Sequence, residues 1–302
     1  MAPTSDPSRR AFAAAGFAGL ALAACGRKAA PPTASAAKTA GAPTPPEQQP
    51  GTLEWAVAGG WRDGDRARDR WRHPLETLRF FGLKPGMTVI EMWPGAGWYT
   101  QILAPFLKAT NGKLYAAGFE AAPGDMAAIM VAGTYQTLFS AKPDLYGQIT
   151  FERFGPASGP LAPPGTVDLV LFMETLHSWM AAGLAEKAFH DAFAALKPGG
   201  VLGVEAHRAA AGGPQDPLAA SGYVQERYVR RMAEEAGFRF DAASEVNANP
   251  ADTRNHPFGV ATLPPERRSS PAGAPADPKF DHGPYDRIGE SDRMTLRFLK
   301  PR

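Results

Sequence analysis

The stretch VIEMWPGAGWYTQIL, residues 89–103, decides the fold. It begins inside residues 87–92 (MTVIEM), which are rich in β-branched side chains and apolar on both faces, as in a strand buried within a parallel sheet. Gly95 and Gly97 follow, and a helical pattern begins directly after them. A strand, a glycine-containing turn and a helix open a doubly wound α/β sheet, whose ligand crevice lies beyond the carboxyl ends of the strands.

The rest of the chain alternates helices and strands in the same way. Residues 70–83 have apolar side chains at helical spacing, and residues 223–238 predict a helix that Gly237 ends. Further strands are predicted at residues 112–119, 148–154, 167–173, 201–206, 239–246 and 292–299, and the last two should pair antiparallel at one edge. The sequence therefore predicts a doubly wound α/β fold with a seven-stranded, mostly parallel sheet and an antiparallel edge strand.

Charge and cysteine content exclude several classes of protein. The 302 residues include 32 Lys and Arg against 30 Asp and Glu, so the net charge of +2 predicts no nucleic-acid partner. With Cys25 as the single cysteine, no internal disulfide can form. Cys/His metal spacing is absent, and His190 lies on an ordinary helix face, so no metal site is expected.

The N-terminal residues 8–25 (SRRAFAAAGFAGLALAAC) have the features of an export signal. Arg9-Arg10 resembles a twin-arginine signal, and the apolar run 11–24 is too short for a permanent membrane span. The run ends in a lipobox-like Leu-Ala-Ala-Cys, which predicts a signal peptide over residues 1–25, lipidation of Cys25 and anchoring on the periplasmic side of a bacterial membrane. The alternative is a frayed Ala-rich helix with an incidental cysteine.

Residues 26–52 are rich in Ala, Pro, Thr, Ser and Gln, which predicts a disordered tether. A folded domain is expected over residues 53–302. Within it, the insert at about residues 247–290 is heavy in Pro, Gly and charge and is longer than an ordinary connection, so we expect either a lid or a mobile segment.

The glycine loop leaves two interpretations open. Thr100 stands where a dinucleotide fingerprint needs its third glycine, which disfavours a nicotinamide oxidoreductase, and no Gly-Lys-Ser/Thr follows to form a P-loop. The loop either binds a ligand or only turns the chain from strand to helix. Trp93 would support the second interpretation by filling part of the pocket, or the first by stacking on an adenine-like group.

Three motifs carry a resemblance to a known family. Val-Ile-Glu-x-x-x-Gly-x-Gly at residues 89–97, the strand motif DLVL at 168–171 and LKPGG at 196–200 resemble class I S-adenosylmethionine-dependent methyltransferases. Residues 73–105, 176–180, 222–238 and 288–301 further resemble a group of predicted bacterial methyltransferases. The resemblance covers most of residues 71–302 and implies a Rossmann-like fold with S-adenosylmethionine as cofactor.

The resemblance also implies roles for single residues. Glu91 would meet the methionine ammonium group of the cofactor, and the backbone at Gly95 and Gly97 would lie against its methionine and ribose. Trp93 replaces the family's first glycine. The acid that usually ends the second strand is absent at Gly118, which leaves Glu120 as the candidate for the ribose hydroxyls.

Candidate acceptor-side residues follow the later strands. A methyl transfer mainly requires positioning and at most a base, for which His177 after the fourth strand and His207 after the fifth are candidates. His177 could instead simply pack beside Trp179. Further candidates for substrate contact, each with capping or turn formation as its alternative, are His73, Glu174, Arg208, Asn247 and Arg254.

Together these features predict an exported, lipid-anchored methyltransferase that acts on a small molecule or an envelope component. S-adenosylmethionine is made in the cytoplasm, so the alternative is a ligand-binding pseudoenzyme that keeps the fold without catalysis. The sequence leaves the acceptor and the oligomeric state open.

Overall fold

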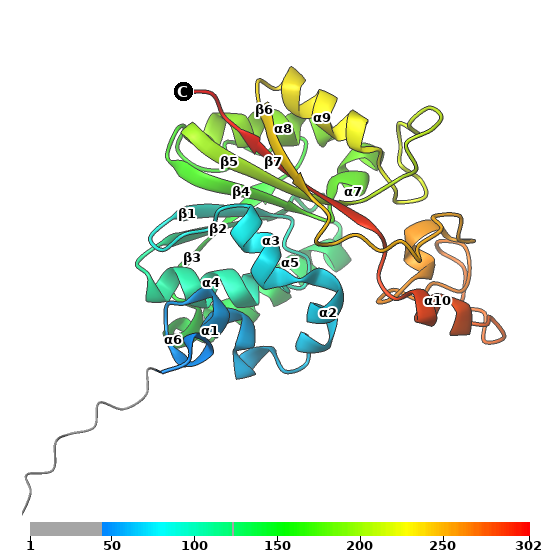
Figure 1. Cartoon of the computed structure of the whole chain (residues 1–302), viewed down its shortest axis with the longest axis horizontal. Coiled ribbons are helices and arrows are strands. Elements are labelled where there is room, and N and C mark those ends of the chain that lie inside the picture. Colours follow the sequence, from blue (N-terminus) through cyan, green and yellow to red (C-terminus); the bar gives the residue numbers. More distant parts are fainter. Residues whose placement is uncertain (1–43, 123) are drawn as a thin grey trace, which may run out of the picture. The chain divides into compact units, whose positions relative to one another are not determined.

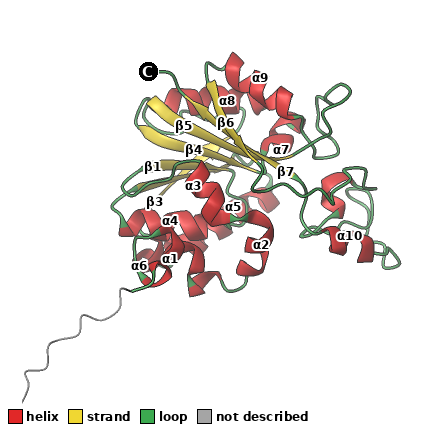
Figure 2. Ribbon diagram, in the orientation of Figure 1, coloured by secondary structure: helices red, strands yellow, loops and turns green. Residues whose placement is uncertain are grey.

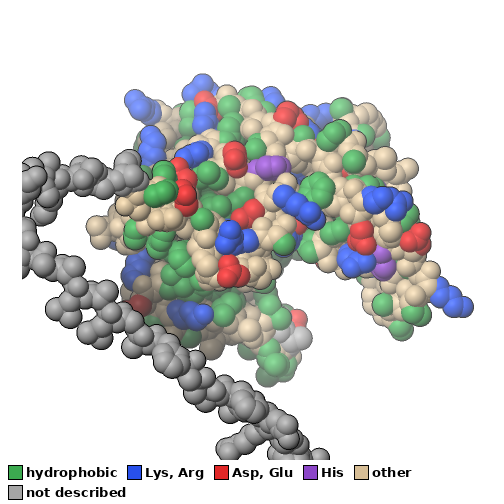
Figure 3. Space-filling view, turned by 60° about the horizontal axis from the view of Figure 1, so that its bottom comes forward, with side chains coloured by type: hydrophobic (Ala, Val, Ile, Leu, Met, Phe, Trp, Pro, Cys, Tyr) green, Lys and Arg blue, Asp and Glu red, His purple; other side chains and the backbone are tan. Residues whose placement is uncertain are grey.

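The structure is a computed structural model and describes residues 44–122 and 124–302. The predicted signal peptide, Cys25 and residues 26–43 of the predicted tether lie outside the described residues. Among the described residues, no helix has both the length and the apolar character to cross a membrane. On the face shown in Figure 3, basic and acidic side chains lie interspersed.

One sheet of seven strands organises the domain (Figure 1 and Figure 2). Its spatial order is β3-β2-β1-β4-β5-β7-β6, with β1 to β5 parallel and β7 antiparallel to both of its neighbours. The strands are β1 (Thr88–Met92), β2 (Lys113–Phe119), β3 (Ile149–Phe154), β4 (Val167–Met173), β5 (Leu196–His207), β6 (Arg239–Ser244) and β7 (Arg293–Leu299). This arrangement confirms the predicted mostly parallel, doubly wound fold of class I methyltransferases, including the antiparallel pairing of the last two strands.

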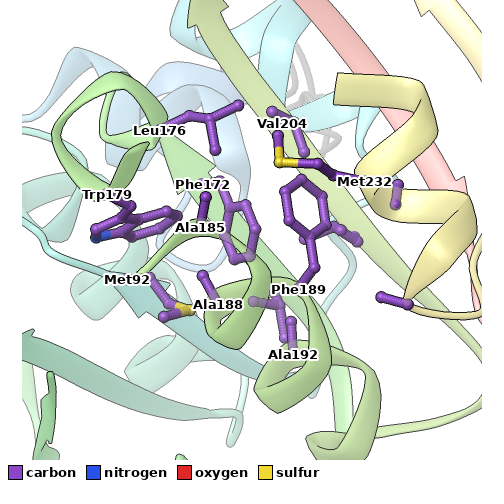
Figure 4. Packing of buried hydrophobic residues seen from close by; sticks show 14 of the residues in the cluster. Met92, Phe172, Leu176, Trp179, Ala185, Ala188, Phe189, Ala192, Val204 and Met232 are labelled. Carbon is purple, nitrogen blue, oxygen red and sulfur yellow. The ribbon is translucent and has the colours of Figure 1, made fainter. Parts of the chain in front are cut away.

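Helices cover both faces of the sheet because its central strands are apolar on both sides. In β1, Ile90 and Met92 belong to one hydrophobic cluster and Val89 to the other, as strand alternation requires. In the first cluster, Phe172 of β4 packs against Trp179 and Phe189 (Figure 4). That face is covered by α7 (Leu176–Ala181), α8 (Ala185–Ala195) and α9 (Glu226–Glu235), and the other by α1 (Leu53–Ala58), α3 (Pro74–Phe80), α4 (Thr100–Ala109), α5 (Met126–Ser140) and α6 (Pro143–Tyr146).

The helix predicted over residues 70–83 is in fact two helices. The first, α2 (Asp69–Arg72), ends at His73, which adopts a left-handed backbone with φ of 37°, and Pro74 then begins α3. Proline has no N–H to continue a helix but is well suited to a first helical position. The break turns the chain so that Arg72 is buried beside the carboxyl ends of the strands.

The insert over residues 247–290 is a lobe beyond the carboxyl ends of the strands (Figure 1). It contains a short 3-10 helix (Gly259–Thr262) and α10 (Gly283–Ile288). Buried polar groups attach it to the rest of the domain. The Asn247 amide donates to the hydroxyls of Thr77 on α3 and Thr295 on β7 at 2.9 and 3.0 Å, and the Asp252 carboxylate accepts from Tyr223. The insert is thus joined to the domain by hydrogen bonds at its start and, as shown below, walls a cavity.

Candidate functional site

Two cavities lie at the carboxyl ends of the parallel strands, where open α/β sheets bind ligands. The first, of about 710 Å³, is lined by the ends of β1, β2 and β3 and by α5. We call it the β1–β3 cavity. The second, of about 530 Å³, is lined by the ends of β4 and β5, by α7 and by the insert, and we call it the β4–β5 cavity.

The two glycines of the loop have different tasks. Both have left-handed backbones, with φ of 58° at Gly95 and 89° at Gly97. A Cβ at Gly95 would meet no atom within 4 Å, and Gly95 lines the β1–β3 cavity. A Cβ at Gly97 would lie 2.4 Å from the ring of Phe139 and 3.1 Å from that of Tyr135, both on α5. The loop therefore exposes backbone to the cavity at Gly95 and admits a packed helix at Gly97.

Trp93 forms part of the same cavity wall. Its backbone is left-handed, with φ of 47°, and its indole N–H donates to the carbonyl of Phe154 at 3.1 Å. Its ring makes edge contacts with the rings of Phe119, Phe154 and Trp179. Non-glycine residues in this conformation are uncommon and carry strain, which the hydrogen bond and the three ring contacts offset.

Glu91 is buried behind the β1–β3 cavity, with only 2% of its surface exposed. Its carboxylate accepts a hydrogen bond from Thr100 Oγ1 at 2.6 Å, and that hydroxyl is 2.9 Å from the hydroxyl of Tyr135, which lines the cavity. Burial raises the pKa of Glu91 to about 8, against the opposing effect of the Thr100 hydrogen bonds. A cation placed in the cavity would favour the ionised carboxylate.

Glu120 does not line the β1–β3 cavity. Its carboxylate accepts from the backbone N–H of Ala157 at 3.0 Å and lines a separate surface pocket. The polar groups that do line the cavity, and that the sequence analysis missed, are Tyr135, Gln136, Glu152, Arg153 and Thr175. The sequence could have indicated Glu152, since it lies near the end of the third predicted strand. In the structure it pairs in register with Ala117 of β2.

His177 and His207 lie together in the wall of the β4–β5 cavity, with ring centroids 5.2 Å apart. The Nδ1 atom of His207 is 2.6 Å from Ser291 Oγ. Burial lowers the pKa of both imidazoles, that of His207 to about 3, although the nearby Glu174 carboxylate opposes the shift. Both rings are therefore neutral at physiological pH, and His207, with its pKa near 3, is a weak base.

A buried ion cluster lies beside these histidines, with arginines from α2 and β7 between three glutamates. Arg293 contacts Glu174 at 2.5 Å, Glu290 at 3.1 Å and Glu205 at 3.3 Å. Arg72 pairs with Glu174 and with Glu290 at 2.9 Å. Burial opposes ionisation of Glu174, but Arg72 and Arg293 hold its pKa well below its ordinary value. Burial of Glu205 has the larger effect and raises its pKa to about 7.

The remaining candidates lie elsewhere. His73 Nδ1 is 3.3 Å from Asn247 Oδ1, so these two side chains connect the α2–α3 break to the insert. Arg208 and Arg254 both pair with Asp292 and line a third cavity. Of the sequence candidates, the structure brings only Glu174, His177 and His207 together in the β4–β5 cavity. No group of three or more His, Cys, Asp or Glu within the described ranges is arranged to hold a metal ion.

Comparisons with known proteins give similarity at the level of the fold. No family model matches the chain, and no curated protein matches it. A SAM-dependent methyltransferase from Aquifex aeolicus is 24% identical, with 62% of this chain and 90% of that chain covered and a TM-score of 0.47. The [4+2]-cyclase SpnF is 16% identical (76% and 80% covered, TM-score 0.49), and an arsenic(III) S-adenosylmethionine methyltransferase from Chlamydomonas reinhardtii is 15% identical (86% and 75% covered, TM-score 0.45).

The raised pKa of Glu91 predicts how its removal changes stability with pH. The folded state binds the Glu91 proton more tightly than the unfolded chain, whose carboxyl keeps an ordinary pKa near 4.5, so stability falls as pH rises from about 4.5 to 8. Glu91→Gln cannot ionise and should melt about 4 °C or more above the wild type at pH 9, but close to it at pH 5.

Thermal melts at the two pH values measure this difference. Glu235→Gln is the control, because the Glu235 side chain is exposed at the end of α9. An equal shift at both pH values would show that Glu91 is not held protonated by burial.

Proposed function

We propose that this chain is an S-adenosylmethionine-dependent methyltransferase that acts on a small molecule or an envelope component. The observation that carries the proposal is the β1–β3 cavity, which opens on the bare backbone of Gly95 and backs onto the buried carboxyl of Glu91. Its volume of about 710 Å³ lies within the range of small-molecule sites.

The chemistry of the cavity suits a cationic ligand without phosphates. Glu91, behind Thr100 and Tyr135, provides a carboxyl that a cation would ionise, and most of the remaining wall is apolar. Trp93 adds an aromatic surface suited to an adenine-like group. S-adenosylmethionine, when bound there, would supply an electrophilic methyl group.

The β4–β5 cavity is the proposed acceptor site because a single turn separates it from the β1–β3 cavity. Thr175 lines the β1–β3 cavity, whereas its neighbour Glu174 and the nearby His177 line the other. Methyl transfer depends on holding two reactants side by side in line. His177 lines this cavity in its neutral form and is the better placed base for an acceptor nucleophile, because the pKa of His207, near 3, makes that ring the weaker base.

A ligand-binding pseudoenzyme is the second candidate, and one observation favours it. The rings of Phe139 and Tyr135 pack against Gly97, where the family resemblance places part of the cofactor. Absence of S-adenosylmethionine binding to the folded chain would support this alternative.

Substitution at Gly95 tests the cofactor site. Gly95→Asn keeps the left-handed backbone, which Asn tolerates, and adds a side chain on the cavity side. We expect at least a tenfold weaker affinity for S-adenosylmethionine, measured by calorimetry on the detergent-solubilised full chain, with S-adenosylhomocysteine and NAD as comparisons.

Gly165→Asn is the matched control, since Gly165 has a similar φ of 67°, equally open surroundings and a place before β4, at the opposite ends of the strands. Equal affinity for S-adenosylmethionine in both variants would show that the cofactor does not bind in the β1–β3 cavity. Binding of NAD alone would favour an oxidoreductase.

Substitution of His177 tests the proposed base. With an acceptor in hand, His177→Ala should lower the methylation rate roughly a hundredfold and leave cofactor affinity nearly unchanged. His190→Ala, on the exposed face of α8, is the control. Because burial lowers the pKa of His177 and His207, the wild-type rate should stay level on lowering the pH through 6.5. An unchanged rate in His177→Ala would remove His177 from the mechanism, with His207 as the next residue to test.

We also propose that the protein is exported and anchored through Cys25, which rests on residues 8–25 of the sequence. Cys25→Ser should abolish labelling by a radioactive fatty acid in a bacterial host and leave a larger, unprocessed precursor. A wild-type protein without label would contradict the anchor but not the methyltransferase proposal.

A further inference from the structure

A third cavity, of about 370 Å³, lies at the end of β5 and is lined by Arg208, Arg227 and Arg254 together with Gln225 and Glu226 at the start of α9. We call it the arginine cavity. We propose that it binds a small anion through a phosphate or carboxylate group. Guanidinium groups recognise both, because their planar N–H donors match the oxygens of either group.

Two of the arginines share one buried carboxylate. Arg208 donates to both oxygens of Asp292 at 3.0 and 2.8 Å, and Arg254 donates to the same carboxylate, which is 1% exposed. Burial disfavours the ionised form of Asp292, but hydrogen bonds from the two arginines lower its pKa. The other partner of Arg208 is Glu245, whose side chain is 67% exposed and so largely screened by water. Arg208 and Arg254 therefore share one fully buried carboxylate, and the second carboxylate partner of Arg208 is exposed to water.

Arg227 adds a positive charge without a carboxylate partner among the described residues. Its guanidinium donates to Gln225 Oε1 at 2.9 Å and to the carbonyl of Gly213, both of which are neutral. Gln225 is itself buried, and its amide donates to the carbonyls of Ala210 and Gly212 at 3.1 and 3.0 Å. These bonds hold the exposed Arg227 side chain at the cavity wall.

The acidic residue in the wall does not cancel this charge. Glu226 pairs with Arg230 one turn further along α9, at 2.9 and 2.5 Å. The positive end of α9 also lies at this wall, and the side chain at its N-cap, Gln225, does not cap it. The helix end adds partial positive charge to the arginine cavity, and it therefore also favours a negatively charged ligand.

The arginine cavity is separate from the proposed acceptor site. His207 and Arg208 are consecutive residues at the end of β5, and side chains in such positions point to opposite sides. His207 lines the β4–β5 cavity, and Arg208 lines the arginine cavity. Anion binding here therefore does not depend on the proposed methyltransferase activity.

Calorimetry with inorganic phosphate, pyrophosphate and succinate tests the proposal on the full chain carrying Cys25→Ser, which removes the proposed anchor. We expect at least one anion to bind, with affinity falling as salt rises. Arg227→Gln should weaken binding at least tenfold. Arg227 is exposed and has neutral partners, so its loss should leave the fold intact.

Arg231→Gln is the matched control, because Arg231 lies on the same helix with its side chain 60% exposed and paired with Glu235. A second arm compares vesicles of phosphatidylglycerol and of phosphatidylcholine. Binding to the anionic vesicles that Arg227→Gln alone weakens would identify a lipid headgroup as the anion, whereas binding of the free anions only would identify a small solute. Absence of all binding, or equal loss in both variants, would overturn the proposal.

Discussion

The pairing of Arg72 and Arg293 with the buried Glu205 and Glu290 and the largely buried Glu174 is the constraint on which the arrangement of the site depends. Removing charges from water costs several kcal/mol each, so such a cluster persists only when every member is held in place by partners. Its members come from α2, the carboxyl ends of β4 and β5, the start of β7 and the end of the insert. Tyr99 extends it to the glycine loop by donating to Glu205 at 2.9 Å. Segments from different parts of the chain are thereby fixed around one point.

This cluster also determines the electrostatics of the neighbouring cavity. Glu174, held ionised by the arginines, lies in a strained left-handed conformation with φ of 59° directly after β4. Left-handed non-glycine residues also occur at Trp93 after β1 and at His73 between α2 and α3. Such strain is found preferentially at functional sites, where the surrounding structure must hold it in place. The strained residues Trp93 and Glu174, directly after β1 and β4, lie at the same edge of the sheet as the two cavities.

The sequence was sufficient for the fold and for part of the site. Strand periodicity, glycine turns and helix-ending signals are local properties, so the seven strands and their mostly parallel pairing could be predicted. The positions of Gly95, His177 and His207 at the carboxyl ends of strands followed from the same reasoning, since those ends meet at one edge. Glu120 shows where this reasoning stops: its side chain turns toward the loop after β3, and Glu152 lines the cavity instead.

What the sequence by itself determined is therefore the order and type of the elements, because these depend on near neighbours along the chain. Only the tertiary structure decided that Gly97 packs against α5 while Gly95 faces a cavity. That distinction depends on the ring of Phe139, which lies 42 residues after Gly97 in the sequence. It also decided that Arg72 and Arg293 share their glutamates, and that Arg208 and Arg254 meet at Asp292 instead of at the acceptor site. Side-chain direction and charge pairing between distant segments are products of packing, and no local pattern encodes them.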